Sequence, residues 1–543
     1  MVLKRNAGAL VNGDDHREGR LAVGHADALD NAASAVFRGL MAEFERRIDQ
    51  SAPTGRHPYS ARIPRIATLA FATVIAIAPA FAETPVPAAT ERSVRADLAR
   101  REASIRAEGL KLLRDGIGAS MTRIDVKDGK LDLTRIAADL GRKHRIIGLG
   151  EATHGTVDIF RAKAEMVRAL VLSGSRYLMI EGGAVGLEAM DDFICGQLPP
   201  KVKVEDVAKT SLFNVWRTQE ILDMFSWLKE FNAKHPQDQV HVFGLDCQAG
   251  NLDNILARVK KADGSFDIAS AQKRDASYRA MADGWLELGT KTSGEFTAPG
   301  PEADAAIAGR FAFLAELRTK LSGIDMSPSE RVRVELAMRS LEQQCGLERA
   351  IVAASRVVEH LAVADMQFAD DGFRDSAMAS NLVYLEKNVV PKDKGIIIWA
   401  HSGHIARKES IDLENAMPIM SMGMALSRWY HNAFHVMNIT VGEGWTRAWP
   451  NLSPQPGDVR VPVAIPPASA DSVEGVIRSI GVNHPVFFRS EDIPLRDSAL
   501  ESLSYGAMRR ACPKEGRVRG PLDTFDSYIF IPTGKSAVGL DGH

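Results

Sequence analysis

Histidines and carboxylates stand at the ends of short apolar runs in this sequence, in positions suited to proton-transfer chemistry. A histidine can accept a proton near neutral pH, and a neighbouring carboxylate can hold its ring in the required orientation. Several such groups in one place could supply a general base, an orienting acid and groups that bind charge on a substrate. The candidate residues are Glu151 and His154 after the first apolar run, Glu181 after the second, Asp246 after the third, and His401 with His404 after the fourth.

The same residues allow a structural or a metal-binding interpretation. A single histidine after a strand is more often structural than catalytic, but four loops that carry such groups together favour a site. A metal site is the other alternative, because imidazole and carboxylate atoms bind zinc. Its candidate ligands are His154, His401, His404, Glu151 and Glu181. The sequence lacks G-x-S-x-G, H-E-x-x-H and Walker A segments, so attack by an activated water is the simpler mechanism.

Buried strands must bring these residues to one edge of a sheet. The apolar runs at 145–149, 177–180, 240–243 and 396–399 have strand length, and apolar residues at helical spacing follow the first run at 157–171. Strands that alternate with helices form parallel sheets covered on both faces, and ligands bind where their carboxyl ends meet. We therefore predict a three-layer α/β fold, with a mostly parallel central sheet, helices on both faces and the site at the carboxyl edge.

The rest of the chain predicts a helical insertion and a return to strands. Residues from about 251 to 387 contain no convincing strand and are rich in alanine, leucine, arginine and glutamate. Apolar runs near 434–441, 486–488 and 527–531 predict the remaining strands. We expect one main domain over residues 116–540, with the helical insertion inside it.

The N-terminal region has the features of an export signal. Residues 1–62 are interpreted as a disordered leader. Residues 63–82 combine a basic start, a short apolar run and Ala80-Phe81-Ala82, a small-x-small pattern typical of signal-peptide cleavage. The run is short for a membrane span, and an uncleaved anchor is the alternative. Residues 83–115 are interpreted as a linker and an N-terminal helix, and we expect a periplasmic or secreted protein.

The balance of charges limits the classes of binding partner, and the cysteine spacing limits the kinds of cysteine site. The chain has 67 basic and 69 acidic residues, for a formal net charge of −2. This balance provides no electrostatic footprint for nucleic acid or for an anionic membrane after signal cleavage, so a small molecule is the expected partner. The four cysteines at 195, 247, 345 and 512 form no C-x-x-C pair, and the sequence leaves open whether any of them forms a disulfide.

The residues around His154 resemble a known signature. The segment Gly148-Leu149-Gly150-Glu151-Ala152-Thr153-His154-Gly155 is similar to the one that opens the erythromycin esterase family. The further segments that agree in order are Ile180-Glu181, Trp216-Arg217-Thr218-Gln219-Glu220, Gly244-Leu245-Asp246-Cys247-Gln248, Arg374 to Asn381, Trp399 to His404, Ser421-Met422-Gly423 and Phe525 to Ile531. The resemblance extends from about Ile146 to Ile531.

This resemblance implies a three-layer α/β hydrolase with helical additions that cleaves a macrolide lactone without a metal or other cofactor. It makes His154 the catalytic base with Glu151 beside it. The other residues that it places in the catalytic site are Glu181, His401 and His404. The candidate substrate-binding residues are Lys163, Arg374 and Asp246. Arg374 could instead form an ion pair on a helix surface, and Asp246 could cap the helix after its strand.

Two features depart from the family pattern. Ser402 stands where asparagine is usual between the two histidines, and the predicted export signal contrasts with resistance enzymes that are regarded as cytoplasmic. An ester hydrolase is therefore the broader prediction, and a macrolide esterase the narrower one.

We predict that Glu151 holds His154 in the tautomer that accepts a proton from water, and that the resulting hydroxide attacks an ester or lactone carbonyl. His401, His404 or Arg374 would stabilise the oxyanion. The alternative is a periplasmic ligand-binding protein whose hydrolytic activity is altered or lost. Turnover of an ester by the purified protein distinguishes the two functions.

Overall fold

The structure is a computed structural model, and it describes residues 88–248, 252–288, 299–357, 363–412, 417–449, 459–465, 468–497, 499–503 and 517–539. The predicted leader, the predicted signal peptide and Cys512 lie outside the described residues. The chain divides into two compact units, Met1–Arg92 and Ser93–His543, and the candidate site belongs to the second.

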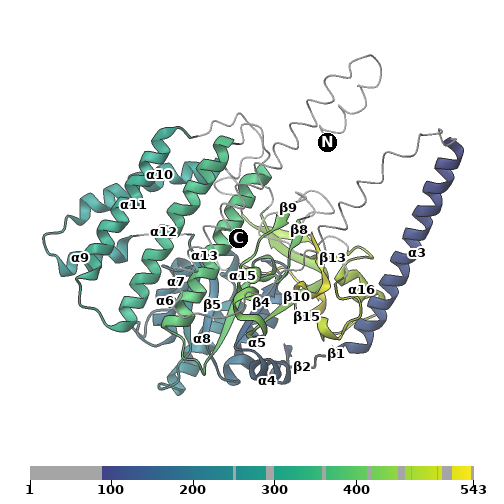
Figure 1. Ribbon diagram of the computed structural model, residues 1–543. Helices are drawn as coiled ribbons and strands as arrows, with labels where there is room; N and C mark the ends of the chain where they lie inside the picture. The colour runs from purple at the N-terminus through teal and green to yellow at the C-terminus, as the bar shows by residue number, and fades with distance from the viewer. Residues whose placement is uncertain are drawn as a thin grey trace, which may run out of the picture. The chain divides into compact units, whose positions relative to one another are not determined.

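A nine-stranded sheet forms the centre of the second unit (Figure 1). Its parallel strands are β4 (Ile146–Glu151), β5 (Ser175–Gly183), β6 (His241–Asp246), β7 (Gly395–His401), β10 (Phe434–Ala448) and β15 (Ser527–Gly534). They lie in the order β15-β10-β4-β7-β5-β6. The antiparallel strands are β12 (Val486–Arg489) and β1 (Thr122–Arg123) beyond β15, and β11 (Val461–Ala464) beside β10. The predicted α/β class with a mostly parallel sheet is confirmed.

Burial on both faces explains why the strands are continuous apolar runs. Every residue of β4 is buried. Ile147 and Leu149 share a core with Phe160 on one face, whereas Ile146 shares a core with Leu382 on the other. Because successive side chains of a strand alternate between the two faces, a strand covered by helices on both sides needs apolar residues throughout.

Helices form a layer on each face of the sheet. One layer contains α4 (Thr134–Lys143), α5 (Val157–Leu172), α6 (Glu188–Ile194), α7 (Val204–Ser211) and α8 (Gln219–Lys234). The other contains the C-terminal end of α3 (Ala88–Ser120), the C-terminal half of α13 (Val363–Asn388), α14 (Ser402–Ile405), α15 (Met422–Tyr430) and α16 (Val473–Ser479). The chain leaves β4 toward β5 and β6, then returns through β7 to β10 on the opposite side of β4. Such a reversal opens a crevice at the carboxyl ends of the strands.

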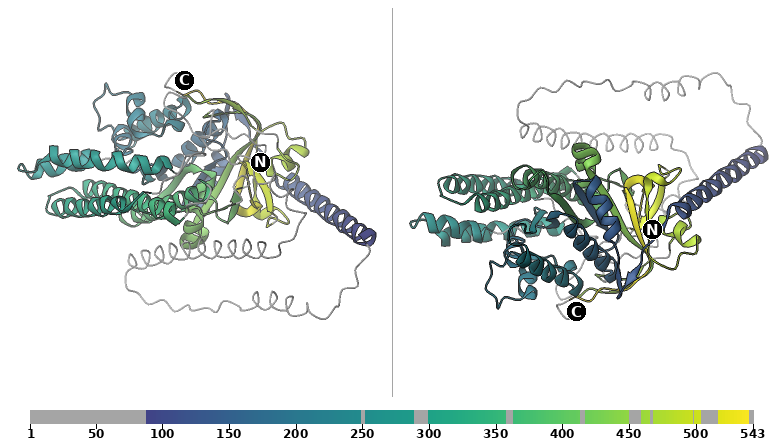
Figure 2. Two further views of the ribbon diagram at one scale, coloured as in Figure 1. Left: turned by 90° about the horizontal axis from the view of Figure 1, so that it is seen from above. Right: turned by 90° about the horizontal axis from the view of Figure 1, so that it is seen from below.

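Long helices fill the segment that was predicted as a helical insertion. They are α9 (Asp253–Ala262), α10 (Ile268–Leu288), α11 (Pro301–Ser322), α12 (Pro328–Val357) and most of α13. In its described residues, 252–288, 299–357 and 363–387, this segment contains no strand. Figures 1 and 2 show α11, α12 and α13 running side by side, and Leu314, Leu317 and Leu341 belong to a core of their own.

Several small elements have no clear signal in the sequence and were not predicted. The short strands are β2 (Val126–Lys127) with β3 (Lys130–Leu131), and β13 (Ala499–Leu503), β14 (Arg517–Pro521), β8 (Ser410–Asp412) and β9 (Met417–Ile419) in a four-stranded sheet. The 3-10 turns are η1 (Asn214–Trp216), η2 (His431–Ala433), η3 (Ser490–Asp492) and η4 (Leu522–Thr524). None of the helices in the described part of the chain combines the length and the apolar composition of a membrane span.

Candidate active site

The end of β4 holds a histidine against a buried glutamate. Glu151 is the last residue of β4 and is fully buried, and His154 follows in the loop before α5. Nδ1 of His154 lies 2.6 Å from Oε1 of Glu151. The residue after His154 is Gly155, and a Cβ atom there would lie 2.1 Å from the backbone oxygen of Arg447. Only glycine therefore lets this loop pack against β10. This tight loop fixes His154 at the carboxyl edge of the sheet.

Two further groups fix the charge of Glu151. Lys163, on α5, donates to Oε2 of Glu151 at 2.6 Å, and Nε1 of Trp216, at the end of η1, donates to Oε1 at 2.8 Å. Burial raises the pKa of Glu151, but the charge of Lys163 and the hydrogen bond from His154 outweigh it and leave the pKa below its usual value. Burial lowers the pKa of Lys163 to about 8, although the charge of Glu151 acts in the opposite direction. Lys163 and Glu151 are therefore both charged at neutral pH.

The same arrangement sets the tautomer of His154. An ionised carboxylate can only accept hydrogen bonds, so the nitrogen of His154 beside Glu151 must carry a proton. The other nitrogen, Nε2, then has a lone pair in the neutral ring. The side chain of His154 is 12% exposed, which leaves part of the ring accessible from solvent.

His401 presents an unused hydrogen-bond donor beside His154. Its Nδ1 accepts from the backbone N–H of Gly403 at 3.2 Å, and its ring centroid lies 4.6 Å from that of His154. Burial and the nearby His154 hold the pKa of His401 well below the usual range, so its ring is neutral and carries its proton on Nε2. This Nε2 is buried and has no hydrogen-bond partner among the described residues.

A charged cluster contacts the loop that carries His401. Nδ1 of His404 lies 2.7 Å from Oδ2 of Asp375, and its Nε2 lies 3.2 Å from Oε1 of Glu181. Burial lowers the pKa of His404, but Asp375 and Glu181 outweigh it and raise the pKa well above the usual range. Glu181 also accepts from the backbone N–H of His401 at 2.7 Å. His404 therefore lies between two carboxylates that favour its charged form, and Nη1 of Arg374 lies 3.1 Å from its Nε2. Glu181 joins this cluster to the loop of His401.

Arg374 connects the end of β6 to the same cluster. Its Nη2 donates to Oε1 of Glu181 at 2.8 Å, and its Nε donates to Oδ2 of Asp246 at 2.8 Å. Burial would raise the pKa of Glu181, but His404 and Arg374 hold it well below its usual value. Glu181 is therefore ionised near neutral pH, and its contacts join His404, Arg374 and the loop of His401.

The structure brings the candidate catalytic residues together. Direct contacts link all five of them across the carboxyl ends of β4, β5 and β7. Glu151 contacts His154, whose ring lies beside that of His401. Glu181 contacts both the backbone of His401 and the ring of His404.

Two of the candidate substrate-binding residues are buried among other protein groups. Lys163 and Asp246 have no exposed surface, because Lys163 is bound to Glu151 and the carbonyl of Ala400, and Asp246 is bound to Arg374. Both side chains contact other protein groups in this structure. Asp246 also accepts from the backbone N–H of Gln248 at 3.0 Å but does not cap α9, whose N-cap is Leu252. Arg374 lies in the buried cluster rather than in a surface ion pair.

Trp216 and Asp375 were not among the predicted site residues. Trp216 binds Glu151 across 65 positions of sequence, and Asp375 binds His404 across 29. Both lie in segments that carried the family resemblance, which is the only sequence signal that points to them.

The atoms proposed as alternative zinc ligands do not converge on one point. Nδ1 of His154, Nδ1 of His401 and both ring nitrogens of His404 already face hydrogen-bond partners. Among the described residues, the atoms of this site do not come within the mutual distances of a group of three metal ligands. The geometry instead places two neighbouring imidazoles, those of His154 and His401, beside a network of ion pairs.

The fold and the site together define an α/β protein with an imidazole–carboxylate centre at the carboxyl edge of its sheet. A model of the erythromycin esterase family matches residues 173–534, and the chain belongs to that family. The resemblance predicted from the sequence is confirmed. The segment with Glu151 and His154 precedes the matched residues.

A curated relative and several solved structures are similar to the chain. The putative hydrolase YbfO of Bacillus subtilis (strain 168) is 26% identical over 278 residues, which cover 49% of this chain and 57% of the relative. A crystal structure of a Bacillus cereus protein has a TM-score of 0.62 at 18% identity and covers 79% of this chain and 99% of that one. A mutant of the erythromycin esterase EreC in its open conformation has a TM-score of 0.56 at 17% identity, with 76% and 98% covered. At these identities, the solved structures show a shared fold.

Proposed function

We propose that this chain is a hydrolase that cleaves a carboxylic ester or lactone by attack of water, with His154 as the general base. The observation that carries the proposal is the 2.6 Å contact between Nδ1 of His154 and Oε1 of Glu151. This contact leaves Nε2 of His154 with a lone pair that can take a proton from water. Family membership and the similarity to a putative hydrolase support the same class of reaction.

His154 transfers one proton in each direction during the proposed reaction. It takes a proton from water while the water oxygen bonds to the carbonyl carbon, and the carbonyl oxygen becomes an oxyanion. The bond to the alcohol oxygen then breaks, and the imidazolium of His154 returns the proton to the departing alkoxide. The products are one carboxylic acid and one alcohol, joined in one molecule when the substrate is a lactone. Glu151 stabilises the imidazolium that forms between the two transfers.

His401 is the proposed donor to the oxyanion. Its buried Nε2–H has no hydrogen-bond partner among the described residues, and its ring lies beside that of His154. A donor aimed at the position where negative charge develops stabilises the transition state, and removal of one such donor typically lowers kcat by about 10²–10³. In the proposed mechanism Glu181, Arg374 and His404 position His401 and do not touch the substrate, because their polar atoms are engaged with one another.

A substrate screen tests this function. The wild-type protein is assayed against simple aryl esters and macrolide lactones, beside the variants His154→Ala and Glu151→Gln and the control His484→Ala, which removes an imidazole in the loop before β12. We expect turnover of at least one ester or lactone by the wild type and the control, and its loss in His154→Ala. A folded wild-type protein that binds such compounds in calorimetry but converts none of them contradicts the proposal and supports a ligand-binding function.

A further inference from the structure

A second cluster of metal-ligating side chains lies at the opposite end of β6 from the active site. Asp191 lies on α6, Cys195 follows the last residue of that helix, and His241 is the first residue of β6. The spacing of four between Asp191 and Cys195 places both on one face of a helical turn. A strand rises about 3.3 Å per residue, so β6 separates His241 from Asp246 in the active site by roughly 16 Å.

The three ligand atoms form a triangle of the size that a zinc ion requires. Sγ of Cys195 lies 3.7 Å from Nδ1 of His241 and 3.9 Å from Oδ1 of Asp191, and these last two atoms lie 3.3 Å apart. Zinc bonds of about 2.3 Å to sulfur and about 2.0–2.1 Å to nitrogen and oxygen, at tetrahedral angles, give ligand separations of roughly 3.3–3.6 Å. Shifts of a few tenths of an ångström would complete one face of the tetrahedron.

A buried asparagine holds two of the three ligands in place. Asn232, on α8, has no exposed surface, and its Nδ2 donates to the backbone carbonyls of Ile194 at 3.1 Å and Val240 at 2.8 Å. Its Oδ1 accepts from the N–H of Val240 at 2.7 Å. Ile194 directly precedes Cys195 and Val240 directly precedes His241, so one amide fixes the separation of the two segments that carry the thiol and the imidazole. Outer groups of this kind orient metal ligands.

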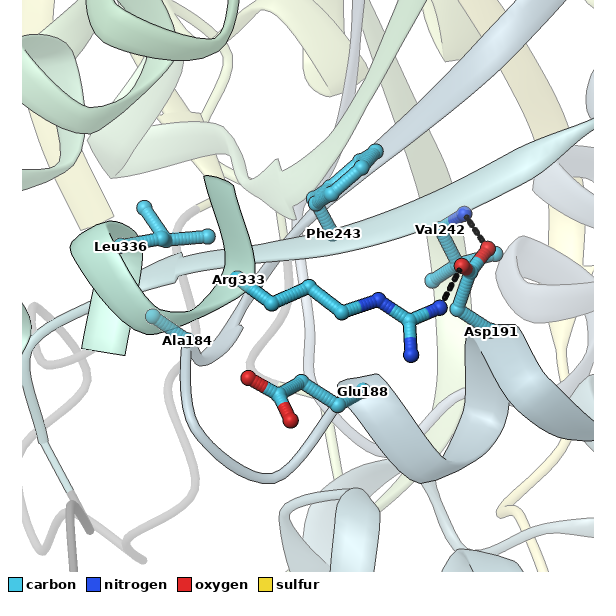
Figure 3. A pocket seen from close by; sticks show the side chains of 8 residues that line it. Ala184, Glu188, Asp191, Val242, Phe243, Arg333 and Leu336 are labelled. Carbon is cyan, nitrogen blue, oxygen red and sulfur yellow. Dashed lines mark hydrogen bonds and ion pairs between the residues drawn. The ribbon is translucent and has the colours of Figure 1, made fainter. Parts of the chain in front are cut away.

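The carboxylate of Asp191 is also held in one orientation. Figure 3 shows its oxygens bound by the backbone N–H of Val242, at 2.8 Å from Oδ1, and by Arg333, at 2.6 Å from Oδ2. Arg333 is shared with Asp192, whose Oδ1 it contacts at 2.6 Å, and Glu188 lines the same hollow. Two carboxylates therefore bind one arginine, and Oδ1 of Asp191 also lies near Cys195 and His241.

The thiol needs a cation to become a ligand. Cys195 is half-buried, and its Sγ lies 3.9 Å from Oδ1 of Asp191. A bound metal ion lowers the pKa of a coordinating thiol, and the displaced proton leaves to solvent. The side chain of His241 is 35% exposed, which provides a route for the ion and room for a water as fourth ligand.

We propose that Asp191, Cys195 and His241 bind a zinc ion that joins α6 to the start of β6. A thiolate, an imidazole and one carboxylate match the ligand preference of zinc, whereas magnesium and calcium prefer oxygen atoms alone. One water completes the tetrahedron. The ion stabilises the fold at the edge of the sheet that faces away from His154, so its role does not depend on the proposed hydrolase activity.

Cobalt(II) is the probe that identifies this site, because a cysteine thiolate bound to cobalt gives a charge-transfer band and the active-site cluster contains no cysteine. The full chain is stripped with a chelator and titrated with Co²⁺ and then with Zn²⁺. The variants are Cys195→Ala and His241→Ala, and the matched control is Cys345→Ala, which removes a buried thiol in the helical insertion. We expect one thiolate-bound cobalt in the wild type and the control, which zinc displaces.

Loss of a residue that only orients a metal ligand typically weakens metal binding by roughly 10–100-fold. Loss of a ligand itself should weaken the binding of zinc by more than this. Cys195→Ala should therefore lose both the band and the increase in Tm that zinc gives the wild type. Alkylation of Cys195 in the wild type, followed by mass spectrometry, tests the site without any variant, and zinc should slow it. The proposal is wrong if the wild type gives no thiolate band, if Cys195→Ala retains it, or if zinc leaves the alkylation rate unchanged.

Discussion

The indole nitrogen of Trp216 lies 2.8 Å from Oε1 of Glu151, the same oxygen that lies 2.6 Å from Nδ1 of His154. Trp216 therefore fixes the carboxylate that orients the proposed base. We expect Trp216→Phe to lower kcat with little change in KM. A hydrogen bond to a charged group contributes roughly 1.5–3 kcal/mol, which corresponds to about 10–100-fold in rate. Steady-state kinetics on a chromogenic ester measures this effect, and an unchanged kcat would show that Trp216 does not position the base.

Lys163 should support Glu151 and not the substrate. Lys163→Met leaves the buried charge of Glu151 without its partner, and loss of one member of a buried ion pair costs roughly 3–5 kcal/mol of stability. We expect the free energy of unfolding to fall by about that amount and to recover in the double variant Lys163→Met with Glu151→Gln. Urea unfolding of the single and double variants measures this. A variant with unchanged stability and a raised KM would instead favour the role in substrate binding that the sequence suggested.

The neutral ring of His401 should make the protein less stable in acid. Burial and His154 hold its pKa well below 6.5 in the folded protein. As the pH falls through about 6.5, the unfolded chain binds a proton at this residue and the folded chain does not, so acid favours unfolding. Each pH unit below this value then lowers the free energy of unfolding by up to about 1.4 kcal/mol, until the pKa of His401 in the folded protein is reached.

The variant His401→Gln should lose that part of the acid dependence, and His484→Gln, in a surface loop, should retain it. Unfolding curves at pH values between about 5 and 8 compare the three proteins. Parallel pH profiles for wild type and His401→Gln would show that His401 is not held neutral.

Hydrolysis should survive removal of metal ions, because each step of the proposed mechanism uses His154, Glu151 or His401. After dialysis against a strong chelator, we expect kcat/KM at a temperature well below Tm to be unchanged and Tm to fall as the proposed zinc ion leaves Cys195 and His241. Metal analysis accompanies both measurements. If chelation abolishes turnover of the folded protein and zinc restores it in Cys195→Ala, the active site itself binds the metal.

We propose that the protein is exported and cleaved after Ala82, because Ala80-Phe81-Ala82 follows a short apolar run. N-terminal sequencing of protein from the periplasm or the medium should begin at Glu83. Recovery of the chain in the membrane fraction with residues 63–82 intact would show that this segment is an anchor.

The sequence predicted the parts of the site that depend on local pattern. Strands buried on both faces are continuous apolar runs, so Glu151, Glu181 and His401 could be found at or near the strand ends. Parallel strands bring such ends to one edge of the sheet. Contacts between distant segments have no such pattern, which is why Trp216 and Asp375 were not predicted. The buried position of Lys163 depends on how α5 packs on β4, and the short strands β8, β9, β13 and β14 lack a long apolar run.

The central claim is that Nε2 of His154 accepts the proton of the attacking water. The most direct test is the kcat/KM of His154→Ala on a cleaved ester, with and without added imidazole, beside thermal unfolding of the same protein. General-base catalysis typically contributes about 10²–10⁴-fold. We predict a loss of at least that order at a Tm close to that of the wild type, and partial recovery of the rate with imidazole. A folded His154→Ala protein that turns over the ester near the wild-type rate would contradict the mechanism.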